Sequence, residues 1–385
     1  MGGSKMSETG NTLTYVTPKL LAQGLLALRE NAIMARLVNR DYGSMAKLKG
    51  NTIDIPIPSA VAVQDVTPGA YSDMTSDFSP TDANLPLDQW KEAPFYLTDK
   101  DMLTCMKGTI PMQASEAIKA IINTVDAYIL GLYVGVYGYA GTADVTPFAT
   151  SVAEATAARK TLTNQLAPLT DRRFVFDADA EANALGLRAF QDASFSGTNE
   201  GIKDGKITRK LGFDWHLDQN VPTHTAGTAN AACTTDGSAY LTGVKTVNLA
   251  SAGTGTILEG DIITFAGDAQ TYAVSTGDTA IADGGTIIFE PGLKVAMGTS
   301  PVAITVKADH VVNLAFHRDA FAFASRPLAD NTKGLGSLIQ SATDPISGLS
   351  LRLEISREHK RTRFSFDMLY GGVLVRPELA CRVAG

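Results

Sequence analysis

The stretch Phe364–Glu378, FSFDMLYGGVLVRPE, is a long apolar run near the C-terminus that contains one charged residue, Asp367, before Arg376. Its aromatic and β-branched side chains favour a strand, and it is longer than a typical strand of roughly five or six residues. No catalytic motif lies within it. The run therefore predicts a long structural strand over residues 363–375.

The composition narrows the class of protein without fixing it. The 385 residues are 44% hydrophobic and only 19% charged, with 35 glycines, whereas soluble domains average about 25% charged residues. A low charge content suits a surface that is covered by neighbouring subunits, and it also suits a β-rich extracellular protein. The net charge of −7 argues against a dedicated nucleic-acid binder, which would carry a basic stripe.

The three cysteines, Cys105, Cys233 and Cys381, are widely separated, and no C-x-x-C pair is present. This spacing disfavours a metal site and predicts free, buried thiols in a reducing cytoplasm. The N-terminus is polar and lacks an apolar core, so no signal peptide is expected.

The N-terminal part of the chain predicts a helix followed by an extended β-arm. Thr17–Pro18 is a helix-start signal, and apolar residues then recur at helical spacing until about Asp41. Alternating residues predict strands at 51–58 and 93–97, both with prolines that exclude a central place in a sheet. The turn-rich segment between them indicates a long arm that orders on a partner.

The longest expected helix spans residues 111–139, a rod of roughly 40 Å. Its apolar stripe consists of Ile118, Ile121, Ile122, Val125, Ile129, Leu132 and Val136. Lys119, Asn123 and Asp126 are expected on the opposite, polar side, and they argue against a membrane span.

The remaining pattern predicts an α+β core that contains a β insertion. A capping box at 151–154 opens a helix, 173–177 is a buried strand, and 178–193 is a second helix. From about residue 222 to 307, short strands recur every ten residues or so, which predicts a small barrel or sandwich. These strands are 245–249, 261–266, 271–274, 286–289 and 302–306. Mixed patterning resumes at His310.

Candidate chemistry is sparse. His216 lies between Asp214 and Asp218 on one expected strand face, but no G-x-S-x-G nucleophile motif accompanies it, and a structural role is favoured. The glycine-rich loop at 333–337 lacks the spacing of a phosphate-binding loop. No catalytic, metal or cofactor site is predicted. The basic run 357–363 indicates either a solvated hairpin end or a contact with an acidic neighbour or DNA phosphates.

Four stretches, in the same order, resemble one family: residues 206–214 followed by Val221–Pro222, the GDIITFAG segment at 260–267, residues 313–327, and the ending at 370–378. Together they resemble the major capsid proteins of tailed phages of the P22 coat protein family. The resemblance implies an α+β HK97-like capsid fold with an inserted small β-barrel domain. The implied parts are an N-terminal arm (1–49), an extended β-loop (50–105), a spine-helix peripheral domain (106–150), an axial domain (151–221), the barrel (222–309), and the rest of the axial and peripheral domains (310–385).

The function that this resemblance implies is mechanical and not enzymatic. Copies would assemble as hexamers and pentamers into an icosahedral phage head around double-stranded DNA, through a scaffolded procapsid that expands on packaging. The implied partners are other copies, a scaffolding protein, a portal protein, weakly bound DNA and a decoration protein, with no cofactor and no membrane. The implied location is the virion capsid, assembled in the host cytoplasm. Assembly contacts are assigned to Arg29, Glu30, Arg36, Trp90, Lys91, Glu92, Arg361 and Arg363.

Three alternatives stay open. An encapsulin-like compartment would share the fold, although the β insertion and the C-terminal ending count against it. A secreted β-rich adhesin or binding module is opposed by the missing signal peptide and the long helix. An enzyme with an unrecognised site is the third.

Overall fold

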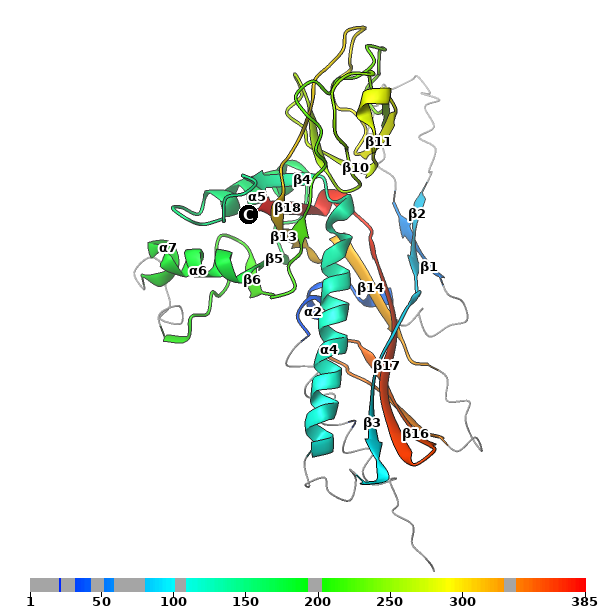
Figure 1. Ribbon diagram of the computed structural model, residues 1–385. Helices are drawn as coiled ribbons and strands as arrows, with labels where there is room; N and C mark the ends of the chain where they lie inside the picture. Colours follow the sequence, from blue (N-terminus) through cyan, green and yellow to red (C-terminus); the bar gives the residue numbers. More distant parts are fainter. Residues whose placement is uncertain are drawn as a thin grey trace, which may run out of the picture.

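The computed structural model describes residues 21, 32–42, 52–58, 80–100, 109–192, 203–328 and 337–385. Within these residues the chain forms a body of two sheets, a long helix beside one of them, and a separate barrel beyond the C-terminal end of that helix (Figure 1). A two-stranded ribbon extends along the side of the body.

The predicted C-terminal strand is confirmed as β17 (Arg361–Leu374), which is the central strand of the first sheet. On one side it pairs with β3 (Gln89–Thr98), and on the other with β16 (Ser350–Glu358) and then β14 (Phe321–Arg326). β15 (Ser337–Thr343) adds to β16. Alternate side chains of β17 are buried in the main core, namely Phe364, Phe366, Met368 and Tyr370.

The long helix packs on this buried face. α4 spans Thr109–Gly131, and its residues Ile118, Ile122 and Val125 are fully buried, as the apolar stripe predicted. Tyr128 meets Tyr370 edge to face, with ring centroids 5.4 Å apart. By length and composition Met112–Gly135 would also suit a membrane span, and here its apolar stripe lies in the core of the body.

The helix ends earlier than its periodicity predicted. After Gly131 the chain forms a short 3₁₀ turn, η3 (Leu132–Gly135), and then β4 (Gly138–Gly141), where a helix had been expected to continue to Tyr139. β4 runs parallel to β18 (Ala380–Ala384), and a Cβ on Gly138 would lie 2.7 Å from the Ala380 carbonyl oxygen. Close sheet pairing with a distant segment therefore overrides the helical pattern.

Asp126 was expected on the polar side of the helix, and that expectation is wrong. The side chain is 1% exposed and accepts hydrogen bonds from the backbone N–H groups of Ile33 and Met34, at 3.0 and 3.1 Å. It thereby holds the first turn of α2 (Met34–Leu37) against α4. Burial raises the pKa of Asp126 to about 7, and the backbone hydrogen bonds oppose this shift.

The second sheet has the order β4–β18–β13–β5–β6. Its further strands are β13 (His310–His317), β5 (Arg172–Phe176) and β6 (Asp214–Leu217), and β7 (Thr223–His224) pairs with the start of β13. The helix α5 (Ala153–Asn164) contributes Ala155, Ala158 and Leu162 to the main core. Its expected capping box is not formed, because Ser151 Oγ accepts from the N–H of Ala153 and Val152 occupies the cap position.

The second predicted helix of this region is interrupted. α6 (Ala178–Gly186) and α7 (Arg188–Gln191) replace the expected helix over 178–193, because Leu187 adopts an extended conformation with ψ of 135°. Asp177 caps α6 by accepting from the N–H of Ala180.

Two chain segments cross side by side from one sheet to the other. The first leads from β13 through η5 (Arg318–Ala320) to β14, and the second from β17 through η6 (Pro377–Leu379) to β18. The Ala320 carbonyl accepts hydrogen bonds from the N–H groups of Val375 and Arg376, at 2.9 and 3.2 Å. The C-terminal residues therefore complete both sheets.

The inserted β unit is a closed barrel with its own core. Its strands follow the order β12–β9–β10–β11–β8, and Thr234 and Thr235 bridge the two outer strands through Ala303 and Leu249. Its core is a separate apolar cluster that includes Tyr272, Phe289 and Ile287. All five predicted strands are present: β8 (Thr246–Asn248), β9 (Ile262–Phe265), β10 (Tyr272–Thr276), β11 (Thr286–Glu290) and β12 (Ile304–Val306). A short turn, η4 (Ile281–Asp283), precedes β11.

A buried polar network joins the barrel to the body. Arg382 of β18 is fully buried and donates to the carbonyls of Gly260 and Val134, at 2.7 and 2.9 Å. Its guanidinium lies 4.9 Å from the ring centroid of Tyr133. His224 lies 3.0 Å from the Tyr133 hydroxyl and 2.9 Å from a carboxylate oxygen of Asp261, which is also fully buried.

The extended arm is built differently from the prediction. β1 (Thr52–Ile57) pairs with β2 (Thr81–Pro86), a strand that the sequence did not indicate, and β3, the second proline-containing strand, belongs to the sheet of β17. The ribbon packs Ile53, Ile55 and Leu85 against Ala322 and Ala324 of β14. Most of the predicted first helix and the loop at 333–336 lie outside the described residues.

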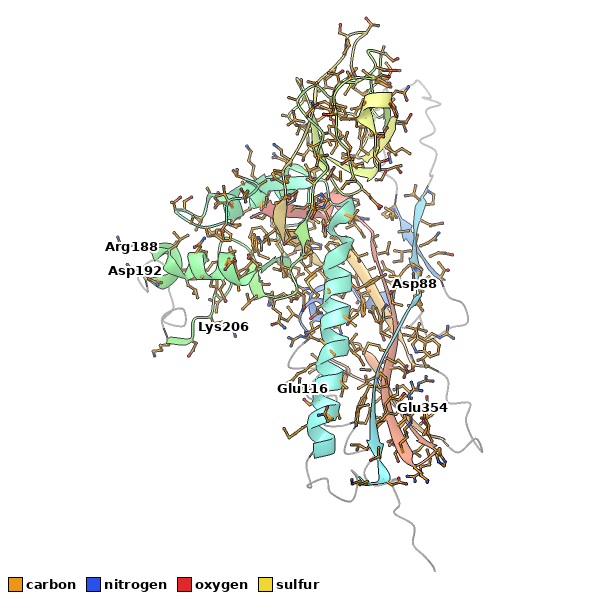
Figure 2. All side chains as sticks on the ribbon, in the orientation of Figure 1. Asp88, Glu116, Arg188, Asp192, Lys206 and Glu354 are labelled. Atoms are coloured by element: carbon orange, nitrogen blue, oxygen red, sulfur yellow. The ribbon has the colours of Figure 1, made fainter. Side chains whose placement is uncertain are left out.

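The buried polar network between the barrel and the body can be tested through its effect on stability. Replacing Arg382 by Met leaves the buried carbonyls of Gly260 and Val134 without their charged donor, so we expect a loss of about 3 kcal/mol in the free energy of unfolding. Urea unfolding measures this loss. The control is Arg188→Met on α7, where the side chain is 75% exposed and pairs with Asp192 at 3.0 Å (Figure 2). We expect the control to lose less than about 0.5 kcal/mol, and equal losses would show that the network does not anchor the barrel.

A second test concerns the pH dependence of stability. The folded chain holds the Asp126 proton up to a pH of about 7, whereas an unfolded chain releases it near a pH of roughly 3.9. The folded state therefore binds more protons in this window, and the Asp126 contribution to stability falls as pH rises through it. We expect the stability of Asp126→Asn, relative to the parent, to rise by up to about 1.4 kcal/mol per pH unit across the window.

Urea unfolding at a series of pH values measures this difference. The stability of the variant must be compared with that of the parent at each pH, because His310 also titrates and its contribution to stability changes with pH in the opposite direction. Burial lowers the pKa of His310 to about 4, so its contribution to stability is lost as pH falls. His310 is common to both proteins and cancels. A difference that does not change with pH would contradict the assignment to Asp126.

Candidate assembly surface

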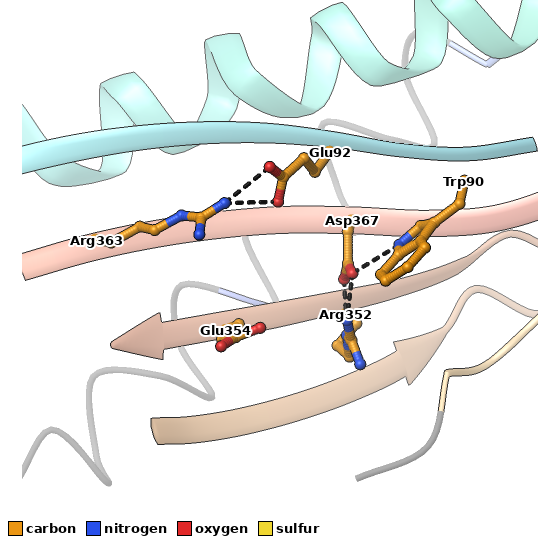
Figure 3. Close-up of a pocket in the computed structure, with 6 residues that line it drawn as sticks. All are labelled: Trp90, Glu92, Arg352, Glu354, Arg363 and Asp367. Atoms are coloured by element: carbon orange, nitrogen blue, oxygen red, sulfur yellow. Dashed lines mark hydrogen bonds and ion pairs between the residues drawn. The ribbon is translucent and has the colours of Figure 1, made fainter. Parts of the chain in front are cut away.

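The outer face of the first sheet, opposite α4, gathers charged side chains from three strands. The strand register places Asp367 of β17 directly between Glu92 of β3 and Arg352 of β16. Because alternate residues share a face, Trp90, Arg363 and Glu354 lie on the same side of the sheet (Figure 3). These six residues line a pocket of about 450 Å³, which we call the Trp90 pocket.

Two ion pairs form the walls of the Trp90 pocket. Arg352 donates through Nε to Asp367 at 2.8 Å, and its Nη2 forms a second bond to the same carboxylate. Arg363 Nη2 lies 2.8 Å from both carboxylate oxygens of Glu92. Ser365 adds a hydrogen bond to Glu92 at 3.0 Å. The first pair is largely buried, and the second is partly exposed.

Trp90 is the most exposed aromatic side chain of this surface, with 62% of its area accessible. Its indole N–H donates to Asp367 at 3.0 Å (Figure 3). Because Asp367 is itself fixed by Arg352, the ring is held in one orientation while its faces remain in solvent. Rigid, exposed aromatic groups of this kind are frequent binding hot spots.

The basic run at 357–363 forms the end of the β16–β17 hairpin, and its arginines have acidic partners within the chain. Arg357 pairs with Asp99 at 2.6 Å, and Arg361 donates to Glu358 at 2.6 Å. The Arg361 guanidinium also lies 4.5 Å from the ring centroid of Tyr96. These contacts favour the hairpin-end interpretation over a free basic patch.

The structure brings together three of the residues that the sequence analysis assigned to assembly, namely Trp90, Glu92 and Arg363. Strand alternation places Lys91 on the opposite side of β3, and Arg36 is exposed on α2. Arg29 and Glu30 lie outside the described residues. The assembly role of these residues stays a prediction.

Sequence reasoning missed Arg352, Glu354 and Asp367. The signal that could have found them is the alternation of polar with apolar residues along β16 and β17. It shows that these side chains share a face, but it does not show which strands are neighbours, so the pairs themselves could not be read from it.

The structure also places the other groups that the sequence analysis considered. Among the described residues no three metal-ligating side chains come together. Cys233 and Cys381 are free and buried, as predicted, and burial raises the pKa of Cys381 to about 12, which disfavours a reactive thiolate. Cys105 lies outside the described residues. Burial lowers the pKa of His216, and neighbouring Asp214 lies 3.8 Å from Arg209.

Comparison with known proteins identifies the fold. A scan against protein-family models gives no match, and no curated protein is similar in sequence. Among solved structures, the chain is similar to a protein of Mycobacterium phage Che8, with a TM-score of 0.53, 17% identity, and coverage of 91% of this chain and 90% of that one. It is also similar to a chain from the capsid structure of the cyanophage P-SCSP1u, with a TM-score of 0.50, 12% identity, and coverage of 92% and 88%.

These similarities extend over nearly the whole of each chain at low identity, so they report on the fold. The fold is α+β and HK97-like, as the resemblance implied. The inserted barrel adds a unit with its own core to that architecture.

The walls of the Trp90 pocket supply a prediction. Asp367→Ala leaves the mostly buried Arg352 without its carboxylate, so we expect a loss of about 2–3 kcal/mol in the free energy of unfolding. The double variant Arg352→Leu, Asp367→Leu should recover most of that loss. Urea unfolding measures both. The control is Asp41→Ala, which removes a surface pair with Arg318 at 2.7 Å and should cost under about 1 kcal/mol. A double variant as unstable as the single one would contradict this account.

Proposed function

We propose that the chain is a major capsid protein that self-assembles into an icosahedral phage head around double-stranded DNA. The observation that supports this most is the HK97-like fold over nearly the whole chain. Scaffold-directed assembly of a procapsid, expansion on DNA packaging, and membership of the P22 coat protein family belong to the same proposal. The inserted barrel and its GDIITFAG segment support the P22-type assignment.

The architecture suits a task in which many weak contacts add up. The β1–β2 ribbon packs one apolar face on its own body and exposes Asp54, Asp82 and Asn84 on the other. Strand ribbons offer backbone hydrogen bonds and side-chain contacts to a partner. A neighbouring copy that meets such a ribbon gains a modest contact, and a closed shell repeats it many times.

The partners follow from this role. Other copies supply the main interfaces, in hexamers and pentamers. A scaffolding protein, a portal protein and a decoration protein are further proposed partners. With a net charge of −7, the wall would contact packaged DNA weakly and without sequence preference, because phosphate binding requires clustered cations. The proposed location is the virion capsid, with assembly in the host cytoplasm.

Electron microscopy of the chain, expressed alone and with its scaffolding partner, tests the proposal. We expect closed shells tens of nanometres across, more uniform in the presence of the partner. Residues 59–79 are then replaced by a short Gly/Ser turn, which spares β1, β2 and β3. We expect this variant to keep the thermal unfolding of the parent and to form no closed shells.

The outcomes separate the alternatives. A strictly monomeric parent protein under all conditions would reject the capsid proposal. Normal shells from the shortened variant would reject only the proposed role of the arm, and the capsid proposal would stand. Virus particles that contain this chain and double-stranded DNA distinguish a phage head from an encapsulin-like compartment, which would enclose protein cargo.

A further inference from the structure

The Trp90 pocket contains more negative charge than positive charge. Three carboxylates and two guanidinium groups line it, which leaves one unbalanced carboxylate. Asp367 and Glu92 are each engaged by an arginine. Glu354 is the remaining acid, and it has no hydrogen-bond or ion-pair partner among the residues that the structure describes (Figure 3).

The pocket is also organised before any ligand arrives. The exposed indole of Trp90 is fixed by Asp367, and Asp367 is fixed by Arg352. Because these side chains are already ordered, a partner would not have to immobilise them on binding. An aromatic face and a free carboxylate in one pocket are together suited to a cation on an aliphatic stem.

We propose that the Trp90 pocket receives a lysine or arginine side chain from a second copy of this chain. The cationic head pairs with Glu354, and the aliphatic stem packs against the pocket wall that Trp90 provides. This proposal rests on the self-assembly proposed above and assigns one contact within it.

The charge distribution of the chain indicates where such a side chain comes from. Residues 51–90, which include the β1–β2 ribbon, contain six aspartates and no lysine or arginine, so this ribbon of a neighbouring copy cannot supply the cation. Residues 1–50 contain seven lysines and arginines against three acids, the reverse balance. The N-terminal fifty residues of a second copy are therefore the segment whose charge complements the pocket.

The test compares two variants that each remove one carboxylate. Glu354→Gln removes the unbalanced charge of the pocket, whereas Glu116→Gln removes an exposed charge on α4, where Glu116 pairs with Lys119 at 2.8 Å (Figure 2). Sedimentation gives the protein concentration at which half of the subunits are in particles. We expect Glu354→Gln to raise this concentration about tenfold, equivalent to about 1.4 kcal/mol, and Glu116→Gln to leave it unchanged.

Two further measurements make the outcome decisive. Glu354→Lys should raise the concentration further, because it places a like charge opposite the incoming cation. Increasing salt should narrow the gap between the parent and Glu354→Gln, since an ionic contact is screened. Unchanged thermal unfolding of the monomers confirms that both variants fold. If the parent forms particles and Glu354→Gln forms them at the same concentration, this inference fails and the capsid proposal stands. If the parent forms none, the capsid proposal itself fails.

Discussion

The body depends on the need to satisfy the backbone of β17 along both of its edges. A long strand exposes a row of N–H and C=O groups on each side, and burying them unpaired would be costly. β3 covers one edge, and β16 and β14 cover the other in succession. Segments from three parts of the sequence are thereby fixed in register. Because successive side chains of a strand point to opposite faces, each side chain of β17 then lies either in the core beneath α4 or on the charged outer face.

The barrel has its own apolar core and is also attached to the body. The barrel has a core of its own, and a small apolar cluster of Tyr137, Ile262 and Ala273 lies where it meets the body. A polar network also connects them, and in it Arg382 of the last strand reaches the turn before β9. Buried charges of this kind contribute little net stability compared with apolar packing, but they tolerate few alternative geometries. The network therefore defines where the barrel sits more than how strongly it is held.

The sequence predicted those features that depend on local periodicity. The five barrel strands, the apolar stripe of α4 and the strand β17 are all visible from spacing alone. What it could not supply are features created by contact with distant segments. The helical spacing of apolar residues continues past Gly131, yet β4 pairs with β18 as a strand instead. Asp126 resembles a solvated helix residue until the backbone of Ile33 is placed against it. The Trp90 pocket joins residues more than two hundred positions apart, and alternation shows only which face each occupies.

The same dependence on neighbouring strands explains how charge is arranged on the outer face of the first sheet. On the outer face of the first sheet, Asp367 and Glu92 each pair with an arginine, and the exposed ring of Trp90 is held by the Asp367 carboxylate. Such pairing lowers the mobility of the side chains on this surface. A rigid, polar face can meet a segment of a neighbouring copy without a large ordering cost. For a protein whose proposed task is repeated association, the ion pairs of this face contribute rigidity.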